Sequence, residues 1–491
     1  MVLGKVRRGP WYARSRTQNK KPAERRVSCF GSRSRIAPVN SPTYLITGAT
    51  DGIGKATALA LAERGARIIT RAKGVFLTDS EGNEILDGMA GLWCVNVGYG
   101  RKELAEVAAH QMEELSYLAP VLSSEPTVAF ADKLQDMLGF DGHVYFSVSG
   151  SEANETAIKI ARQYHLQNGK PGEHRYKILS RYRGYHGNTL GSMTATGQAE
   201  RKMGYEPGGA GFVHVMPPYP YRRHEKLTVE EHGAEMVKLM EETIIHEGAQ
   251  TIAALIMEPM ISGGGIMVPP DCYVPGIRAL CDKYGILLIF DEVVSGFGRT
   301  GKMFGHQHWN TQADIFTFAK GLASGYMPIA ATVVKPEIFN AFLGKPGDMT
   351  HFRQINTFGG HTVSTAVAMR NVQIVEDEDL TGNAARMGKY FRDQMAAEVG
   401  DHPFVGEIRG LGLLNGIELV EDRQTKAPLP EAKLNVVTGT AIQSGVFLGR
   451  NSNTIPGRCN VLLIAPPLVI NQSETDQIVA AIKKGLTAAM G

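Results

Sequence analysis

From about residue 71 onward, short apolar runs alternate with segments of helical periodicity along this chain of 491 residues. The runs at 144–148, 176–179, 253–257, 286–291 and 315–318 have the length and apolar content of buried strands. Strands that alternate with helices form a largely parallel sheet with helices on both faces, so the pattern predicts an α/β fold. Hydrophobic residues make up 43% of the chain and charged residues 21%, which excludes a disordered chain, a collagen-like fibre and a coiled coil.

The order of these patterns predicts how the chain is divided into domains. Long helical stretches follow residue 366, and strand-like segments at 409–420 and 461–469 then predict a smaller α+β lobe. We therefore expect, in chain order, a basic extension (1–43), a βαβ fragment (44–70), the N-terminal part of a small domain (71–120), a large, ligand-binding domain (121–365) and the C-terminal part of the small domain (366–491).

The first 40 residues contain most of the excess positive charge. They hold 11 Lys and Arg residues but a single acid, Glu24, and the rest of the chain is mildly acidic. Composition therefore gives no reason to expect nucleic acid or a membrane as a partner. Three prolines and few aliphatic residues predict a disordered extension, although Arg- and Ser-rich composition is also typical of an organelle transit peptide.

The cysteines and the apolar runs indicate a cytoplasmic protein. Five cysteines without a CxxC pair are typical of reduced thiols, and we expect neither disulfides nor a metal site. No apolar stretch approaches the roughly 18 residues that a membrane span needs.

Four features follow predicted strands, where parallel sheets place their ligands. Ser149-Gly150-Ser151 opens a helical pattern and suits a phosphate group, although alone it fits an ordinary helix cap. Tyr185 lies between two glycines and offers a flat face for a ring, or is a core tyrosine in a turn. Asp291 ends a buried run and needs a cation such as a protonated pyridine nitrogen. Lys320 ends another run, where a lowered pKa permits Schiff-base chemistry, although a surface lysine also fits.

Each of these four features alone is weak evidence for a cofactor site. Their order along the chain, with 29 positions from Asp291 to Lys320, is a much more specific signal. The chain here resembles the class III aminotransferases that depend on pyridoxal 5′-phosphate (PLP), in their ω-amino acid and amine:pyruvate branch. The resemblance runs from about residue 65 to 491. It is carried by GLWCVNVGYGRK (91–102), SGSEANETA (149–157), GYHGNT (184–189), FDEVVSGFGRTG (290–301), FTFAKGLASGYMPI (316–329), TFGGH (357–361), RGLGL (409–413) and APPLV (465–469).

The resemblance implies a fold-type-I PLP enzyme and a role for each matching residue. Lys320 is expected to form the covalent link to PLP and to move the proton during the reaction. Asp291 is expected to pair with the ring nitrogen, and Tyr185 and Val293 to contact the ring. Gly150, Ser151 and Glu258 are implied as further cofactor-binding residues. Thr357 matches a threonine that completes the phosphate site of the partner subunit, so a homodimer is implied.

The implied reaction moves an amino group from an ω-amino acid or primary amine (β-alanine-, taurine- or diamine-like) to pyruvate or another keto acid by a ping-pong mechanism. Trp93 matches a tryptophan of the substrate pocket. Arg450 matches an arginine that binds the keto-acid carboxylate, with Arg458 as a rival, and Leu463 stands where the ornithine-type branch has its arginine. Pro120, Val121 and Leu122 stand where the branch often has aromatics, so a roomier, aliphatic amine pocket is expected.

Two alternatives remain. Residues 44–69 resemble the opening of a short-chain dehydrogenase, with TGATDGIG (47–54) as the glycine-rich turn. None of the 16 tyrosines has a lysine four residues later, so the proton-exchanging pair of that family is missing. The first alternative is therefore a truncated NAD(P)-binding fusion with impaired or no transaminase activity. The second keeps PLP but catalyses racemisation, amino-group migration or decarboxylation.

Overall fold

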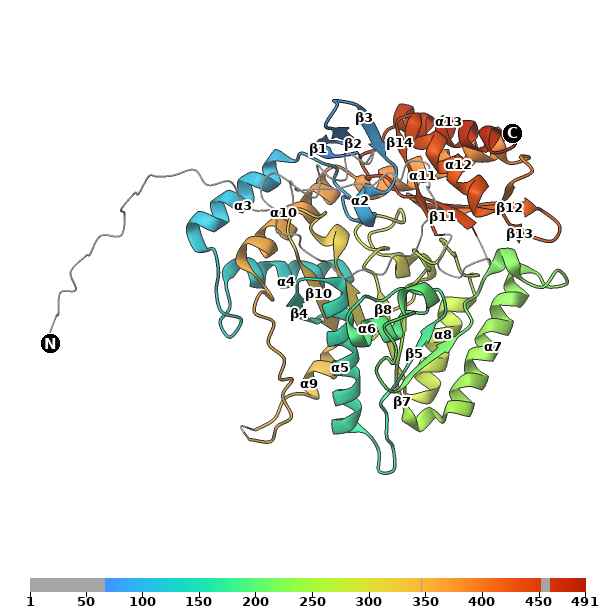
Figure 1. Ribbon diagram of the computed structural model, residues 1–491. Helices are drawn as coiled ribbons and strands as arrows, with labels where there is room; N and C mark the ends of the chain where they lie inside the picture. The colour runs from blue at the N-terminus through green and yellow to red at the C-terminus, as the bar shows by residue number, and fades with distance from the viewer. Residues whose placement is uncertain (1–66, 346, 452–459) are drawn as a thin grey trace, which may run out of the picture.

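The structure is a computed structural model, and it describes residues 67–345, 347–451 and 460–491 (Figure 1). The basic extension, residues 44–66 of the expected βαβ fragment and Arg458 lie outside the described residues. Within the described residues, no helix is long and apolar enough to cross a membrane.

A seven-stranded sheet forms the centre of the larger lobe, in the order β4-β10-β9-β8-β7-β5-β6. Its strands are β4 (His143–Ser147), β5 (Lys177–Arg181), β6 (Phe212–Val215), β7 (Ile252–Met257), β8 (Leu287–Asp291), β9 (Ile315–Phe318) and β10 (Ala330–Val334). All neighbouring strands pair in parallel except β10, which is antiparallel to both β4 and β9. The expected α/β fold with a largely parallel sheet is confirmed.

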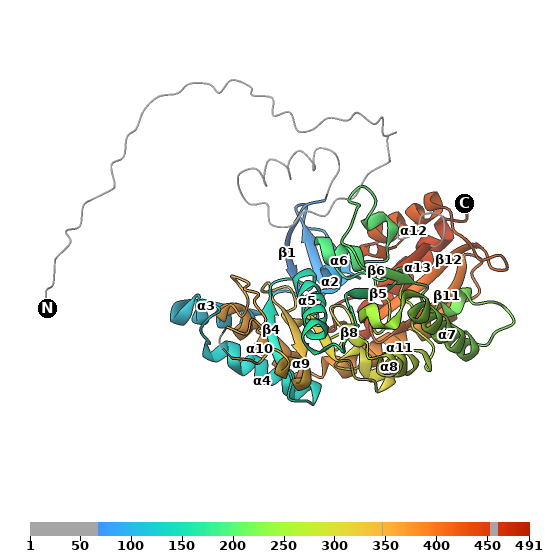
Figure 2. The same ribbon diagram turned by 90° about the horizontal axis from the view of Figure 1, so that it is seen from below.

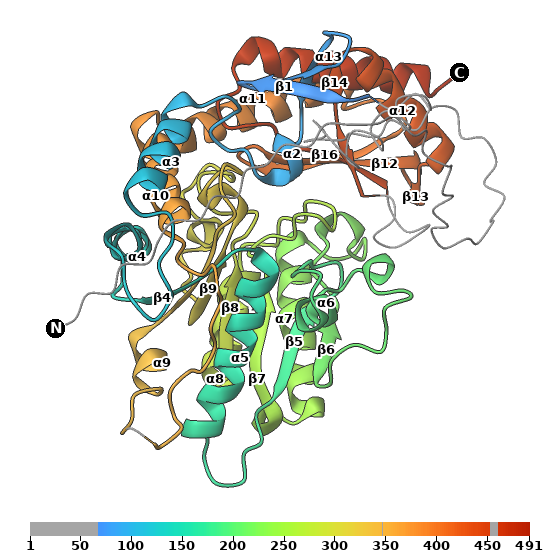
Figure 3. The same cartoon turned by 60° about the vertical axis from the view of Figure 1, so that its left-hand side comes forward.

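Helices cover both faces of this sheet (Figures 2 and 3). Successive strand residues point to opposite sides, so each strand contributes apolar side chains to a core on each face. In β8, Ile289 packs on the side of α5 (Gly150–Asn168), whereas Leu288 and Phe290 belong to the opposite core. That second core contains α7 (Val229–Glu247), α8 (Tyr273–Tyr284), α4 (Glu125–Leu138) and α10 (Thr362–Asp377). Burial on both faces explains why these strands are continuous apolar runs in the sequence.

The smaller lobe joins the two ends of the described chain. A sheet of β11 (Val405–Leu411), β12 (Leu414–Asp422), β16 (Asn460–Ile464) and β15 (Gly449–Arg450), with β13 (Ala427–Pro428) beside β12, lies against α11 (Leu380–Val399), α12 (Glu431–Gln443) and α13 (Gln472–Ala488). A second sheet contains β1 (Ile69–Lys73), β2 (Phe76–Asp79), β3 (Glu84–Asp87) and β14 (Val446–Phe447). Val75 and Leu86 share one buried core with Phe391 and Leu462, so the blue and red segments of Figure 1 pack together.

The remaining helices connect these layers. They are α2 (Ala90–Trp93), α3 (Lys102–Leu115), α6 (Leu190–Ala195), α9 (Pro336–Asn340) and the short turns η1 (Ala199–Arg201), η2 (Pro220–Arg222), η3 (Ala249–Thr251), η4 (Gly305–Trp309) and η5 (Lys320–Leu322). Helix α3 packs along α10 and so ties the N-terminal segment to the larger lobe.

Three expected strands differ from those found. The segment 409–420 is a hairpin of β11 and β12, which turns at Gly412 with a φ of +51°. The strand expected at 461–469 ends at Ile464, because Pro466 and Pro467 have no N–H to donate to a neighbouring strand. The last strand of the expected βαβ fragment overlaps only the start of β1, and β1 pairs antiparallel with β2.

Candidate active site

A cavity of about 780 Å³ lies beyond the carboxyl ends of the parallel strands, with walls from both lobes. It brings together nine of the ten residues that the sequence predicts for a site, and these are Trp93, Gly150, Ser151, Tyr185, Glu258, Asp291, Val293, Lys320 and Arg450. Thr357 does not line this cavity. The cavity therefore lies where parallel sheets place their ligands.

Asp291, at the end of β8, is buried and held in one orientation by three donors. His186 Nδ1 and Asn154 Nδ2 each lie 2.8 Å from its Oδ2, and the N–H of Val293 donates to Oδ1 at 3.1 Å. Because a carboxylate only accepts hydrogen bonds, His186 must carry its proton on Nδ1. Its Nε2 is buried without a partner among the described residues. The three donors thus fix the orientation of the Asp291 carboxyl group at the wall of the cavity.

His186 and Asn154 lie within the motifs GYHGNT and SGSEANETA, but the sequence alone indicates no role for either residue. Asn154 sits in α5 and also donates to the carbonyl of His186 at 2.7 Å, while its Oδ1 accepts from Thr317 at 2.7 Å. A polar residue in a helix is ordinarily expected on the protein surface, but Asn154 is buried.

Lys320 begins η5 directly after β9, and its φ of +48° lies in the left-handed region. Burial lowers the pKa of Lys320 below its ordinary value, even though the charges of Asp291, Cys94 and Glu258 oppose this. A lysine with a lowered pKa has more of its neutral, nucleophilic amine at neutral pH. The position therefore suits covalent attachment of a carbonyl compound.

Tyr185 and Glu258 are linked through the backbone. The N–H of Tyr185 donates to Glu258 Oε1 at 3.2 Å, and the N–H of Ser262 donates to Glu258 Oε2 at 2.9 Å. Burial raises the pKa of Glu258, and burial also raises the pKa of Tyr185. Glu258 thereby fixes both the loop that carries the Tyr185 ring and the loop that follows β7.

The start of α5, where the sequence predicts a phosphate site, lines the cavity. The N–H groups of a first helical turn have no partner within the helix, and the helix dipole makes this end positive. Ser151 exchanges hydrogen bonds with Asn188, which tie it to the loop after β5. A Cβ at Gly150 would lie 3.1 Å from both methyl groups of Val293, so glycine lets strand end and helix start approach closely.

The candidate substrate residues lie on the other side of the cavity. Trp93 has its indole N–H buried without a partner among the described residues. Arg450 is exposed, donates to Asn435 Oδ1 and lies 3.8 Å from the carboxylate of Glu431. Pro120, Val121 and Leu122 line a separate groove of about 210 Å³, so the roomier pocket that we inferred from them is not formed within one chain.

The same small groove contains the neighbours of Thr357. Its lining includes Asn356 and Gly359, and the carbonyl of Thr357 accepts from Tyr117 at 3.0 Å. Thr357 itself is exposed. Within a single chain this residue has no contact with the cavity that holds Lys320.

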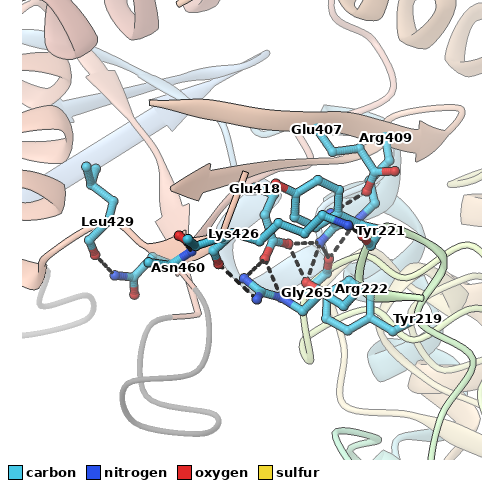
Figure 4. Close-up of polar contacts among 12 residues, drawn as sticks. Tyr219, Tyr221, Arg222, Gly265, Glu407, Arg409, Glu418, Lys426, Leu429 and Asn460 are labelled. Atoms are coloured by element: carbon cyan, nitrogen blue, oxygen red, sulfur yellow. Dashed lines mark hydrogen bonds and ion pairs between the residues drawn. The ribbon is translucent and has the colours of Figure 1, made fainter. Parts of the chain in front are cut away.

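A buried ion network ties the smaller lobe to one wall of the cavity (Figure 4). Glu418 of β12 is fully buried and accepts from Arg222 at 2.7 Å, from Arg409 at 2.8 Å and from the Tyr219 hydroxyl. Arg409 also donates to the carbonyls of Gly265 at 2.6 Å and Ile266 at 2.8 Å. The loop held in this way contains Gly263, which lines the cavity.

These residues fit PLP by the chemistry of their side chains. The cavity offers an amine for an aldehyde, an oriented carboxylate for a ring nitrogen, a positive helix end for a phosphate and an aromatic side chain for a ring. The close approach at Gly150 and the three donors on Asp291 are built features of the site.

Comparison with known proteins gives one consistent result. The family model Aminotransferase class-III matches residues 60–486. The taurine–pyruvate aminotransferase of Bilophila wadsworthia is 44% identical over 422 residues, which are 86% of this chain and 92% of that protein. The family match begins inside the segment 44–70, and these matches do not support its resemblance to a dehydrogenase.

Solved structures agree with this result. A Bacillus anthracis aminotransferase is 46% identical with a TM-score of 0.84, covering 88% of this chain and 99% of its own. An omega transaminase from Pseudomonas jessenii, solved in complex with PMP, is 35% identical with a TM-score of 0.83, covering 88% of this chain and 95% of its own. The fold expected from the sequence, that of fold-type-I PLP enzymes, is confirmed.

Proposed function

This chain belongs to the class III aminotransferases, enzymes that use PLP, and on that premise we propose that its substrates are an ω-amino acid or primary amine and pyruvate or another keto acid. The observation that carries the proposal is the single cavity in which Lys320, Asp291 and Tyr185 face the same space as Trp93 and Arg450. One side of the cavity offers the chemistry of a cofactor site, and the other offers an arginine and an aromatic wall for substrates.

Bound PLP supplies an aldehyde that captures the amine and a ring that stabilises negative charge on the neighbouring carbon. Asp291 would pair with the ring nitrogen and favour its protonated form, because His186 and Asn154 fix the orientation of the Asp291 carboxylate. Tyr185 and Val293, which both line the cavity, would hold the ring. The first-turn N–H groups of α5 at Gly150 and Ser151 would hold the phosphate.

Lys320 acts twice in the proposed reaction. Its neutral amine would be the group that holds the cofactor covalently, and when freed the same Nζ would hold and release the proton that the reaction moves. The lowered pKa of Lys320 serves both roles, since only the neutral amine is a nucleophile and a base. Arg450 binds the carboxylate of the keto acid through its planar pair of donors.

We also propose that the enzyme is a homodimer in which Thr357 completes the phosphate site of the partner. Large apolar side chains near Thr357 are exposed, with Val121 at 76%, Ile355 at 73% and Phe358 at 57% exposure. Such a cluster is typical of a surface that another chain covers. The same contact would bring Val121 and Leu122 toward the cavity of the second chain.

The visible absorbance of the purified, PLP-loaded protein tests the proposal. We expect a band that a donor such as taurine or β-alanine bleaches and that pyruvate restores, which demonstrates both halves of a ping-pong reaction. Lys320→Ala should lack the band of covalently attached PLP. A racemase or decarboxylase would need no keto acid for turnover. A wild-type protein that stays colourless with added PLP would support the inactive-fusion alternative.

A further inference from the structure

Three cationic side chains line the active-site cavity within the described residues: Lys320, Arg450 and Arg201. The first two have roles in the proposed reaction. Arg450 is also engaged with α12, because it donates to Asn435 and lies near Glu431. The guanidinium of Arg201 makes no hydrogen bond or ion pair with any described residue. A cation in a cavity without a protein partner is available for an anionic ligand.

The backbone at Arg201 is fixed although its side chain is exposed. Arg201 ends η1, and the residue that precedes this turn, Gln198, is buried and donates from Nε2 to the carbonyl of Arg183 at 3.0 Å. Gln198 itself lines the cavity. The positive charge of Arg201 acts on Tyr185, where it opposes the rise in the tyrosine pKa that burial causes. The guanidinium therefore belongs to the same space as the cofactor-side residues.

The surfaces around this space are largely apolar. Leu92, Trp93, Met327 and Phe447 all line the cavity and offer no formal charge. A short carbon chain can therefore lie in the cavity, while an acidic group needs the guanidinium. Arginine suits carboxylate and sulfonate groups alike, because its planar donors can bind two oxygens together.

We infer that Arg201 binds the acidic end of the amine donor, so that the donor class is a short ω-amino acid or aminosulfonate and not a simple amine. This inference rests on the proposed function and narrows its substrate class. Arg450 and Arg201 then divide the two anionic substrates between them. Arg450 holds the keto acid, whereas Arg201 holds the donor by the end that does not react.

Glu200 precedes Arg201 and also lines the cavity, exposed to solvent. Its carboxylate makes no ion pair with Arg201 in the described residues. The acidic group of a donor is therefore attracted by Arg201 and repelled by Glu200. In a variant without Arg201, only the repulsion by Glu200 remains. Removal of the Glu200 carboxylate should instead strengthen the binding of acidic donors, and this opposite effect is a second test of the inference.

The test compares donors of similar length on the PLP-loaded enzyme with pyruvate as acceptor. In Arg201→Gln, kcat/KM for taurine and β-alanine should fall about 10- to 100-fold, the usual loss for one charged hydrogen-bonding partner. The value for propylamine should stay within about twofold, since this amine has no acidic group to lose a partner. Glu200→Gln should raise kcat/KM for the two acidic donors. Lys202→Gln is the matched control, because it removes the same charge one residue away from the cavity lining.

Binding of isethionate, which has the sulfonate but no amine, gives a readout that does not depend on turnover. Calorimetric titration of the PLP-loaded protein should show a Kd that rises about 10-fold or more in Arg201→Gln and is unchanged in Lys202→Gln. If the wild type converts no amine, the proposed function fails, while isethionate binding still decides the role of Arg201. Equal losses for acidic and neutral donors, unchanged isethionate binding, or loss of bound PLP in Arg201→Gln would each overturn the inference.

Discussion

The substitution Glu418→Gln tests whether the buried network of Figure 4 holds the smaller lobe against the active-site wall. Glu418 is fully buried and receives the charged donors of Arg222 and Arg409 as well as the Tyr219 hydroxyl. Glutamine has nearly the same shape but no charge, and its NH₂ group faces guanidinium donors. Removing one partner of a buried ion network costs about 3–5 kcal/mol, so we expect the free energy of unfolding to fall by that amount.

The effect should depend on pH in a defined way. Burial alone would raise the pKa of Glu418, but Arg409, Tyr219 and Arg222 outweigh it and hold the pKa below its ordinary value. A carboxyl group with a lowered pKa contributes stability above its unfolded pKa of about 4.3, and this contribution is lost as the pH falls through the folded pKa. The wild type and Glu418→Gln should therefore differ by a constant amount from pH 6 to 8 (roughly, the range above both values) and converge in acid.

Urea unfolding of the PLP-free protein, followed by tryptophan fluorescence and circular dichroism, measures this difference. The matched control is Glu398→Gln, whose carboxylate lies 2.7 Å from Lys483 but is 42% exposed. Such a surface pair contributes about 0–1 kcal/mol, so the control should unfold nearly as the wild type does. A loss below about 1 kcal/mol in Glu418→Gln at pH 7 would refute the argument that the buried network stabilises the lobe contact.

Three further outcomes test the proposed site. Asp291→Asn should slow both half-reactions by about 100-fold or more, because a neutral amide cannot hold the ring proton, while the content of bound PLP stays unchanged. Absorbance measures the PLP content, and stopped-flow absorbance measures the two rates. A rate within threefold of wild type (roughly, half a kcal/mol) would contradict the role of Asp291. Lys320→Ala and Thr357→Val, each impaired alone, should recover activity when co-expressed, since one site of the mixed dimer then has both residues; no recovery would mean that Thr357 acts within its own chain. Gly263→Leu should lower kcat/KM for bulky aromatic amines about 10-fold more than for propylamine, because the new side chain extends toward Trp93, 3.6 Å from the first added carbon; an equal loss for both amines would exclude a steric cause.

The sequence predicts the large sheet well, because burial on both faces turns strands such as β7 and β8 into continuous apolar runs. It does not predict that β10 runs antiparallel to its neighbours. Hydrophobicity records which faces of a strand are buried but not the direction of the chain within it. The hairpin of β11 and β12 was likewise expected as one segment, because only Gly412 and Leu413 separate the two strands.

The site residues divide in the same way. Asp291 and Lys320 could be found because a charged side chain directly after an apolar run is unusual. His186 and Asn154 could not, because their roles depend on hydrogen bonds that join segments 105 and 137 positions from Asp291. Arg201 has no pattern around it in the sequence, and only the cavity brings it near Tyr185. The domain limits at residues 120 and 365 and the homodimer remain predictions.

The left-handed backbone conformation at Lys320 lowers the stability of the fold, so only the catalytic role of this residue favours keeping a lysine there. A residue with a Cβ in this conformation costs about 1–2 kcal/mol that glycine would avoid. The buried amine adds a further cost, because burial disfavours its charged form. A lineage that no longer needed the amine could therefore gain stability by replacing it, and drift would carry position 320 toward glycine or asparagine. Lysine at this position is a residue that the fold alone gives no reason to keep.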